Sequence, residues 1–153
     1  MRHPIAALII ALGVCVPAHA ASPRMGSVTV EHAWARATPK GAPNAAVYLT
    51  LVNNGSETDR LIGASSPVAD NIQFHEELDE NGVSKMRALQ SIEVAPGAPV
   101  VLKPNGLHLM LRIKQQLKED ETFPLTLTFE KAGLIEATVK VGKVGAMDDM
   151  RGM

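Results

Sequence analysis

The sequence has little cysteine, little net charge and no long apolar run. Its one cysteine is Cys15, and the formal net charge of the 153 residues is −1. A near-neutral balance argues against nucleic acid or an anionic membrane as a partner. The longest apolar run, from Ile5 to Val16, is shorter than the about 20 residues that a membrane helix needs. We find no nucleophile motif, no phosphate-binding loop and no paired acid and base, so we expect that the protein is not an enzyme.

The start of the chain is typical of an export signal. A basic residue, Arg2, precedes the apolar run, and Ala18-His19-Ala20 provides a small-x-small cleavage site. We predict that residues 1–20 are a signal peptide and that the mature protein is periplasmic. The alternative is a lipid on Cys15, because the residues before it loosely resemble a lipobox, although Val14 is a poor residue at that position.

Cleavage after Ala20 leaves residues 21–153, which are enough for one domain with its own core. This mature chain has 14 basic and 16 acidic residues, a net charge of −2, and no cysteine. Packing rather than disulfides must therefore hold the fold together. In an oxidising compartment, methionine offers a sulfur that cannot form a disulfide. We expect a single-domain monomer.

The middle of the chain alternates short apolar segments with turn residues. Ten segments have the length and pattern of strands. They are Ser27–Ala35, Asn44–Val52, Arg60–Ala64, Asn71–Leu78, Val83–Ala88, Ser91–Ala95, Pro99–Leu102, Leu107–Ile113, Thr122–Glu130 and Leu134–Val141. They predict roughly eight to ten strands and an all-β fold, an antiparallel β-sandwich or Greek-key barrel, over residues 21–141. The polar stretch 114–121 could hold one helical turn, and the glycine-rich segment 142–153 predicts a flexible tail that contains methionine.

Two histidines and two methionines, His75, Met86, His108 and Met110, have the spacing His-x10-Met-x21-His-x-Met. Between residues 26 and 146 there is no other methionine, and His32 is the only other histidine of the mature chain. Soft, uncharged thioethers with neutral imidazoles form a ligand set that suits Cu(I) better than Zn, Mg or Ca. Because imidazole binds metal only when neutral, affinity should fall below about pH 6.5. The absence of a thiolate argues against a blue-copper electron-transfer site.

The expected strands bring these four residues together. The segment Asp79–Gly82 predicts a hairpin between the strands that carry His75 and Met86. A four-residue loop would place the two residues directly opposite each other, and a two-residue turn would place them diagonally, on the same face in both cases. His108 and Met110 also share a face, because they are two residues apart on one strand. The sequence therefore predicts one metal site, near one end of the sandwich.

The chain resembles the PCuAC family of periplasmic copper chaperones, whose hallmark is this spacing. The resemblance extends to Ala33–Arg36, Ala45–Tyr48, Asn53–Gly55, Asp59–Leu61, Gly82-Val83 and Leu102–Pro104. The family often has Pro-Gly-Gly before the second histidine, where this chain has Pro104-Asn105-Gly106; asparagine tolerates left-handed backbone, so we expect the loop to be retained. The resemblance implies a cupredoxin-like β-sandwich that binds one Cu(I). It further implies delivery toward the binuclear copper centre of cytochrome c oxidase, to an oxidase subunit or a Sco-type assembly factor.

Alternatives stay open. The protein could sequester copper for tolerance rather than deliver it, or it could be a β-sandwich interaction module in which the four residues are incidental. The tail methionines Met147, Met150 and Met153 could form a second, looser copper site. We expect Trp34 and Tyr48 to be core aromatics.

Overall fold

A computed structural model describes residues 27–148 as ten strands without a helix. They are β1 (Val28–Arg36), β2 (Asn44–Asn53), β3 (Asp59–Ser65), β4 (Ala69–Glu80), β5 (Val83–Leu89), β6 (Ile92–Val94), β7 (Val100–Val101), β8 (Leu107–Ile113), β9 (Thr122–Phe129) and β10 (Gly133–Gly142). Each strand overlaps one of the ten predicted segments, and the all-β fold class is confirmed. The predicted signal peptide, residues 1–20, lies outside the described residues.

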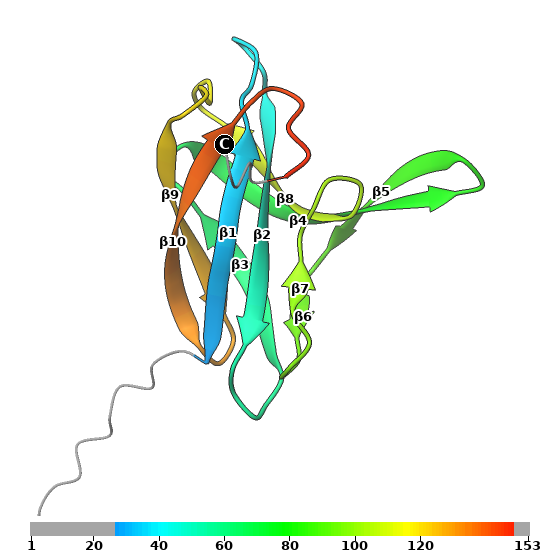
Figure 1. Ribbon diagram of the computed structural model, residues 1–153, viewed down its shortest axis with the longest axis vertical. Coiled ribbons are helices and arrows are strands. Elements are labelled where there is room, and N and C mark those ends of the chain that lie inside the picture. The colour runs from blue at the N-terminus through cyan, green and yellow to red at the C-terminus, as the bar shows by residue number, and fades with distance from the viewer. Residues whose placement is uncertain (1–26, 149–153) are drawn as a thin grey trace, which may run out of the picture.

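The strands form one sheet in the order β5-β4-β8-β2-β1-β10-β9-β3-β6, with β7 paired to β2. This sheet folds over so that its two halves face each other as a sandwich (Figure 1). The β1–β10 pair is parallel, and the other strand pairs among residues 27–148 are antiparallel. The β4–β5 hairpin projects away from the sandwich, at the right of Figure 1.

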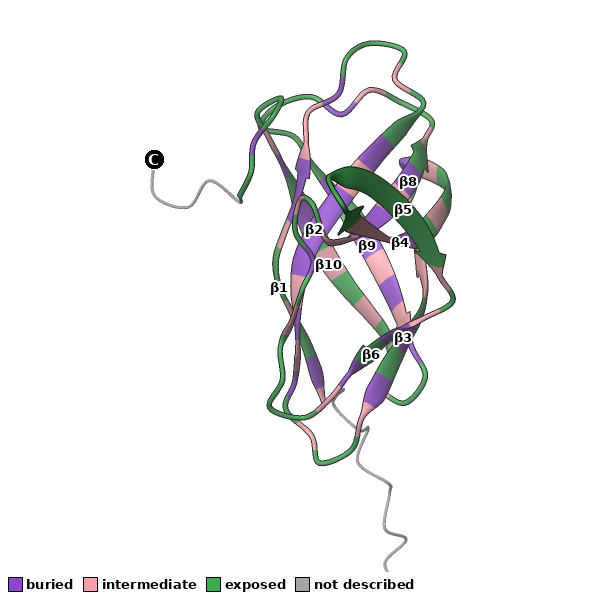
Figure 2. Ribbon diagram, turned by 90° about the vertical axis from the view of Figure 1, so that its right-hand side faces the viewer, coloured by how far each residue is buried: buried purple, intermediate pink, exposed green. Residues whose placement is uncertain are grey.

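Strict alternation of side chains builds the core between the two halves. On β8, Leu109 and Leu111 point inward and are fully buried, whereas His108 and Met110 belong to the outer face. On β9, alternate residues from Phe123 to Phe129 are buried. Figure 2 shows the buried residues as stripes along the strands of the sandwich, whereas β5 is exposed along nearly its whole length.

A β-bulge interrupts this alternation in β1. Glu31 pairs with Thr50 and Trp34 with Tyr48, so two residues of β1 lie opposite one residue of β2. His32 takes the left-handed conformation that this requires, with φ 54°. The extra residue shifts the side-chain phase by one, which places Trp34 on the outer face and the next residue, Ala35, in the core.

At the end of the sandwich where β3 begins, a buried carboxylate holds a turn in place. Asp59 Oδ1 accepts hydrogen bonds from the backbone N–H groups of Arg60 (2.8 Å) and Lys131 (2.9 Å), and Oδ2 accepts one from Ala132 (2.8 Å). Asp59 is 1% exposed, so water cannot readily replace these bonds. This side chain ties the start of β3 to the β9–β10 turn.

The structure adds detail to two segments outside the strands, and it corrects the prediction for one of them. Residues 114–121 hold no helical turn; instead Leu117 inserts into the core, and its N–H donates to the Thr38 hydroxyl (3.0 Å). The described part of the predicted tail, residues 143–148, turns back onto the outer face of β1 and β2, where Ala146 is buried against Trp34 and Tyr48. Residues 149–153, with Met150 and Met153, lie outside the described residues, and the flexibility of the tail stays a prediction.

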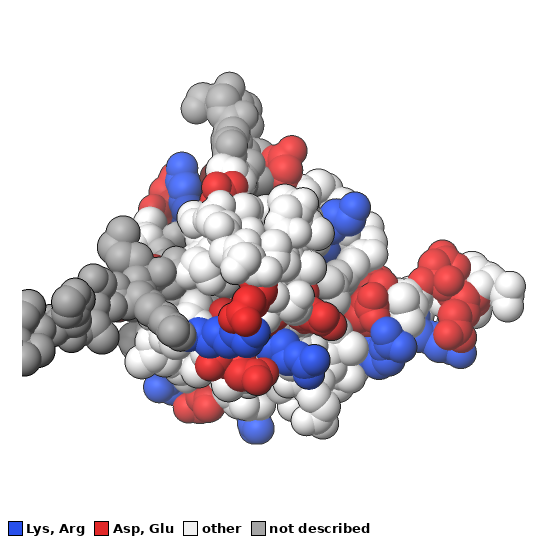
Figure 3. Space-filling view, turned by 90° about the horizontal axis from the view of Figure 1, so that it is seen from below, with Lys and Arg blue, Asp and Glu red and all other residues white. Residues whose placement is uncertain are grey.

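Charges of both signs are mixed on the surface. On the end of the molecule seen in Figure 3, basic and acidic side chains lie side by side, and the projecting hairpin carries both. On the hairpin, Lys85 pairs with Glu80 (2.5 Å) and Arg87 pairs with Glu76. Among residues 27–148, no helix is long and apolar enough to span a membrane.

Candidate metal centre

The four residues of the spaced motif lie on three adjacent strands and share one outer face. His75 on β4 is the direct cross-strand partner of His108 on β8. The neighbouring pair on the same face is Gln73 and Met110. Met86 on β5 lies opposite Glu77, and is therefore diagonal to His75.

The turn of the β4–β5 hairpin decides between the two registers that the sequence left open. Asn81 and Gly82 have φ of 55° and 79°, as the two central residues of a type I′ turn require. The Gly82 N–H donates to Asp79 Oδ1 (2.8 Å), which closes the turn. This two-residue turn places Met86 diagonal to His75 rather than directly opposite it.

Side-chain contacts join His75 to two of the other motif residues. His75 Nδ1 lies 3.1 Å from Met86 Sδ. The imidazole rings of His75 and His108 meet edge to face, with centroids 5.7 Å apart. Met110 joins them through its strand position, because it pairs with Gln73 on the same face of β4 and β8.

His108 is the most enclosed of the four. It is 3% exposed, and its Nδ1 lies 3.0 Å from the carbonyl oxygen of Gly106. The loop before it places Asn105 at φ 63°, and the Gly106 N–H donates to the Lys103 carbonyl (3.1 Å). Asn105 thus adopts the left-handed backbone that asparagine tolerates, which agrees with the expectation for this loop.

Exposure increases across the site from β8 to β5. His108 is buried and Met110 and His75 are half-buried, but Met86 is 53% exposed on the edge strand. One side of the site is therefore fixed in the sandwich, and the other is open to a partner.

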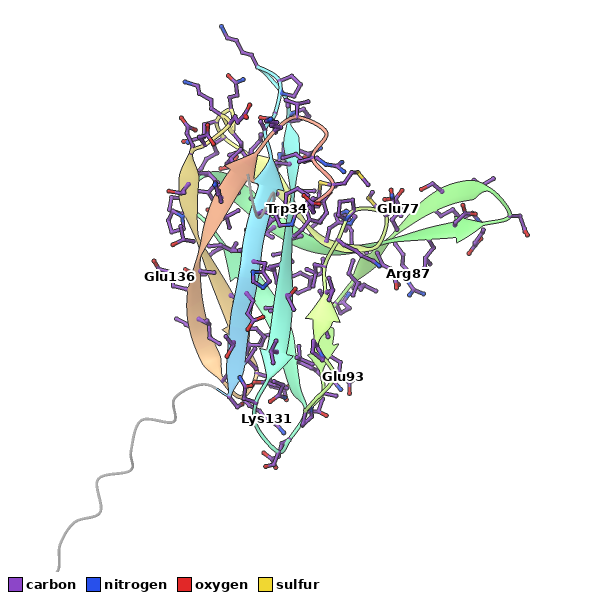
Figure 4. All side chains as sticks on the ribbon, in the orientation of Figure 1. Trp34, Glu77, Arg87, Glu93, Lys131 and Glu136 are labelled. Carbon is purple, nitrogen blue, oxygen red and sulfur yellow. The ribbon has the colours of Figure 1, made fainter. Side chains whose placement is uncertain are left out.

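An aromatic wall closes the buried side of the site. Tyr48 lies 6.4 Å from the His108 ring and packs against Trp34, with centroids 4.6 Å apart. Both aromatic residues are buried, as expected, but they form a cluster on the outer face rather than part of the main core, because the bulge turns Trp34 outward. In the view of Figure 4, Trp34 on the sandwich is level with Glu77, which lies where the hairpin leaves the sandwich.

The tail is fixed to this wall by one arginine. Arg36 lies over the Tyr48 ring, 5.8 Å from its centroid, and its Nε donates to the Ala146 carbonyl (2.6 Å). Its Nη2 donates to Met147 Sδ (3.1 Å). Met147 and Trp34 line a surface pocket of about 290 Å³ that also includes residues just before the His108 loop.

The surroundings shift two titrating groups. Partial burial, and then the neighbouring His108, lower the pKa of His75 from its usual value of 6.5. The imidazole of His75 therefore keeps a free lone pair to lower pH than an ordinary histidine. Burial raises the pKa of Tyr48; the cation of Arg36 opposes this effect, and the carboxylate of Glu77 adds to it.

The sequence did not point to two neighbours of the site. Gln73 Oε1 lies 3.3 Å from His75 Nε2, and Arg36 secures the tail. Glu77, one of the acidic residues that follow His75 in the sequence, lies opposite Met86. Gln73 and Glu77 each lie two residues from His75, so alternation alone indicates that they share its face. Arg36 gave no such signal, because its position depends on the bulge and on contacts with the tail.

Comparison with known proteins identifies the architecture. The copper-bound PCuAC domain from PmoF2 is 30% identical, with a TM-score of 0.67 over 78% of this chain and 95% of that chain. The solution structure of apo-DR1885 from Deinococcus radiodurans is 26% identical, with a TM-score of 0.60 over 94% of this chain and 97% of that chain. A family model described as "Putative lipoprotein LpqE-like" matches residues 28–141.

The chain belongs to the LpqE-like family, and its domain is of the PCuAC type. A further relative, "Putative lipoprotein Lxx21020" of Leifsonia xyli subsp. xyli, is 30% identical over 156 residues, which cover 97% of this chain and 93% of that protein. The predicted family and β-sandwich are thus confirmed. The PCuAC domain of this chain carries the complete four-residue motif on one face of β5, β4 and β8.

Proposed function

We propose that this protein binds one Cu(I) ion through His75, Met86, His108 and Met110 and passes it to a partner protein. The observation that carries the proposal is that the four residues, which come from three segments of the sequence, lie on one face of three adjacent strands, with His75 Nδ1 and Met86 Sδ 3.1 Å apart. Thioethers and imidazoles form a soft, uncharged donor set that favours Cu(I). The copper-bound state of the PmoF2 PCuAC domain supports copper as the metal.

The exposure of Met86 supports transfer rather than permanent storage. A donor on an edge strand that is 53% exposed can be replaced by a ligand from another protein while the buried side of the site stays intact. We propose that the acceptor belongs to the assembly of the copper centre of cytochrome c oxidase, either an oxidase subunit or a Sco-type factor. Copper transfer from the loaded protein to a purified candidate acceptor distinguishes delivery from sequestration.

We place this activity outside the cytoplasm. Residues 1–20 have the pattern of an export signal, and the donor set contains no thiol that could be lost to oxidation. The matching family model and the relative from Leifsonia xyli are both named as lipoproteins. Signal cleavage after Ala20 and lipid attachment at Cys15 both lead to the same side of the membrane.

A carboxylate next to an uncharged donor set should strengthen cation binding. Glu77 lies opposite Met86, so replacing it with glutamine is expected to lower Cu(I) affinity about fivefold at low salt, and less at high salt. Glu76→Gln is the matched control, because Glu76 pairs with Arg87 on the opposite face of the hairpin. Chelator competition at two ionic strengths measures both variants; equal losses in the two would rule out a local effect of Glu77.

The ligand set is tested by titrating Cu(I) into residues 21–153 in the presence of a competing chelator. The parent is expected to bind one equivalent, and the His75→Ala/Met110→Ala variant to lose that binding. The variant His32→Asn/Met147→Leu is the control, because it also removes one imidazole and one thioether but spares the motif, and asparagine tolerates the left-handed backbone at position 32. Equal binding by the parent and the motif variant, or no binding by the parent, would overturn the proposed function.

A further inference from the structure

Each of the two imidazoles has an oxygen acceptor at one ring nitrogen, and the thioether sulfur that faces the other nitrogen of His75 is only a weak acceptor. For His108, the carbonyl oxygen of Gly106 lies 3.0 Å from Nδ1. For His75, the side-chain oxygen Oε1 of Gln73 lies 3.3 Å from Nε2, and the other nitrogen, Nδ1, faces the sulfur of Met86. The oxygen acceptor therefore lies at Nδ1 of His108 but at Nε2 of His75.

These contacts determine where each ring carries its proton. A neutral imidazole has one N–H and one lone pair, and an amide oxygen can only accept a hydrogen bond. Because the amide oxygen of Gln73 is a stronger acceptor than the thioether of Met86, the contacts favour donation by His75 from Nε2 to Gln73, which leaves the lone pair on Nδ1. His108 donates from Nδ1 to Gly106, which leaves its lone pair on Nε2.

We propose that Gln73 is a positioning residue that fixes His75 as its Nε2–H tautomer, so that His75 offers Nδ1 to the metal while His108 offers Nε2. This inference rests on the proposed function, since it concerns the same site. Partners of this kind fix the tautomer and orientation of a metal-binding histidine and raise its basicity. Gly106 acts through its backbone, whereas Gln73 acts through a side chain that substitution can remove.

The geometry around His75 favours Nδ1 as the donor. Metal bonds to imidazole nitrogen and to sulfur are about 2.0 and 2.3 Å long at a comparable ion, zinc. Their combined length exceeds the 3.1 Å between His75 Nδ1 and Met86 Sδ, so one ion can bond both atoms from a point beside the line that joins them. In the other tautomer, with the proton on Nδ1, that proton would lie between His75 Nδ1 and the Met86 sulfur, where the ion would have to bind.

Neighbouring strands hold Gln73 where this role requires it. Gln73 is two residues before His75 on β4, and its backbone pairs with that of Met110 on β8. Glu77, on the same face, accepts the hydroxyl of Ser84 at Oε1 (2.6 Å), whereas the side-chain oxygen of Gln73 faces His75 Nε2. Gln73 therefore supplies the acceptor for His75 without adding charge to the site.

The test compares Gln73→Leu, which removes the acceptor, with Gln73→Glu, which retains one. The ¹⁵N chemical shifts of the His75 ring in the metal-free protein, recorded near pH 8, report the tautomer directly. The parent and Gln73→Glu are expected to show protonated Nε2, and Gln73→Leu to shift toward protonated Nδ1. Cu(I) affinity by chelator competition is expected to fall about 10- to 100-fold in Gln73→Leu and to be largely retained in Gln73→Glu.

A remote control separates this role from a general effect of losing a glutamine. Gln115→Leu changes an exposed glutamine in the β8–β9 connection and should alter neither readout. An unchanged His75 tautomer in Gln73→Leu would overturn the inference, even if the parent binds one Cu(I) as proposed. A parent that binds no copper would instead overturn the proposed function, while the ring shifts would still test the role of Gln73.

Discussion

Replacing His108 with alanine is expected to lower Cu(I) affinity by about a hundredfold or more, whereas Met86→Leu is expected to lower that affinity clearly less. Removing only a hydrogen-bond partner of a metal ligand lowers metal affinity about 10- to 100-fold, and His108→Ala removes the ligand itself. His108 is 3% exposed and oriented by the Gly106 carbonyl, so no solvent ligand replaces it easily. Met86 is 53% exposed, so water or a buffer ligand can take its place.

Chelator competition on the two single variants measures this order. Circular dichroism and thermal unfolding of the metal-free proteins are the controls, because His108→Ala opens a space beside Tyr48 and His75. A second substitution, His108→Gln, restores part of the volume and should still lose copper. Equal losses for Met86 and His108, in variants with parental unfolding curves, would contradict the order that exposure predicts.

Replacing Asp59 with alanine is expected to lower the free energy of unfolding by about 3 kcal/mol or more, with no direct effect on the metal site. The substitution leaves the backbone N–H groups of Arg60, Lys131 and Ala132 without their acceptor. A buried donor that loses its partner costs about 1 to 3 kcal/mol, and the turn between β9 and β10 can relax to recover part of this.

Chemical denaturation of the metal-free protein measures the effect. Asp59→Asn retains one carbonyl oxygen and should lose less stability than Asp59→Ala. A loss below about 1 kcal/mol for Asp59→Ala would show that water reaches the three donors and that the carboxylate is not what holds the turn.

Much of the sandwich was predictable because most of its strands have one buried and one outer face. In β8 the order Leu-His-Leu-Met-Leu assigns leucine to the core and leaves His108 and Met110 on the outer face. The hairpin also followed from local chemistry, since Asn81 and Gly82 accept the positive φ of a tight turn. The choice between its two registers did not, because both kept Met86 on the face of His75.

Other features depend on contacts that alternation does not encode. The bulge at His32 arises where β1 pairs with β2, and it turns Trp34 from an expected core position to the outer face, beside Tyr48. The packing of Ala146 depends on Arg36, 110 positions earlier in the sequence. Residues 114–121 are polar enough to be taken for a helical turn, but one buried side chain, Leu117, holds them as a loop.

The unequal exposure of the four donors has a kinetic consequence for the proposed transfer. An incoming ligand can replace Met86 at the edge strand while His108 still holds the ion from the sandwich. The copper then passes through a complex shared by both proteins and is never free in water. Transfer by this route speeds up with acceptor concentration, and it can be fast even where spontaneous release of the ion is slow.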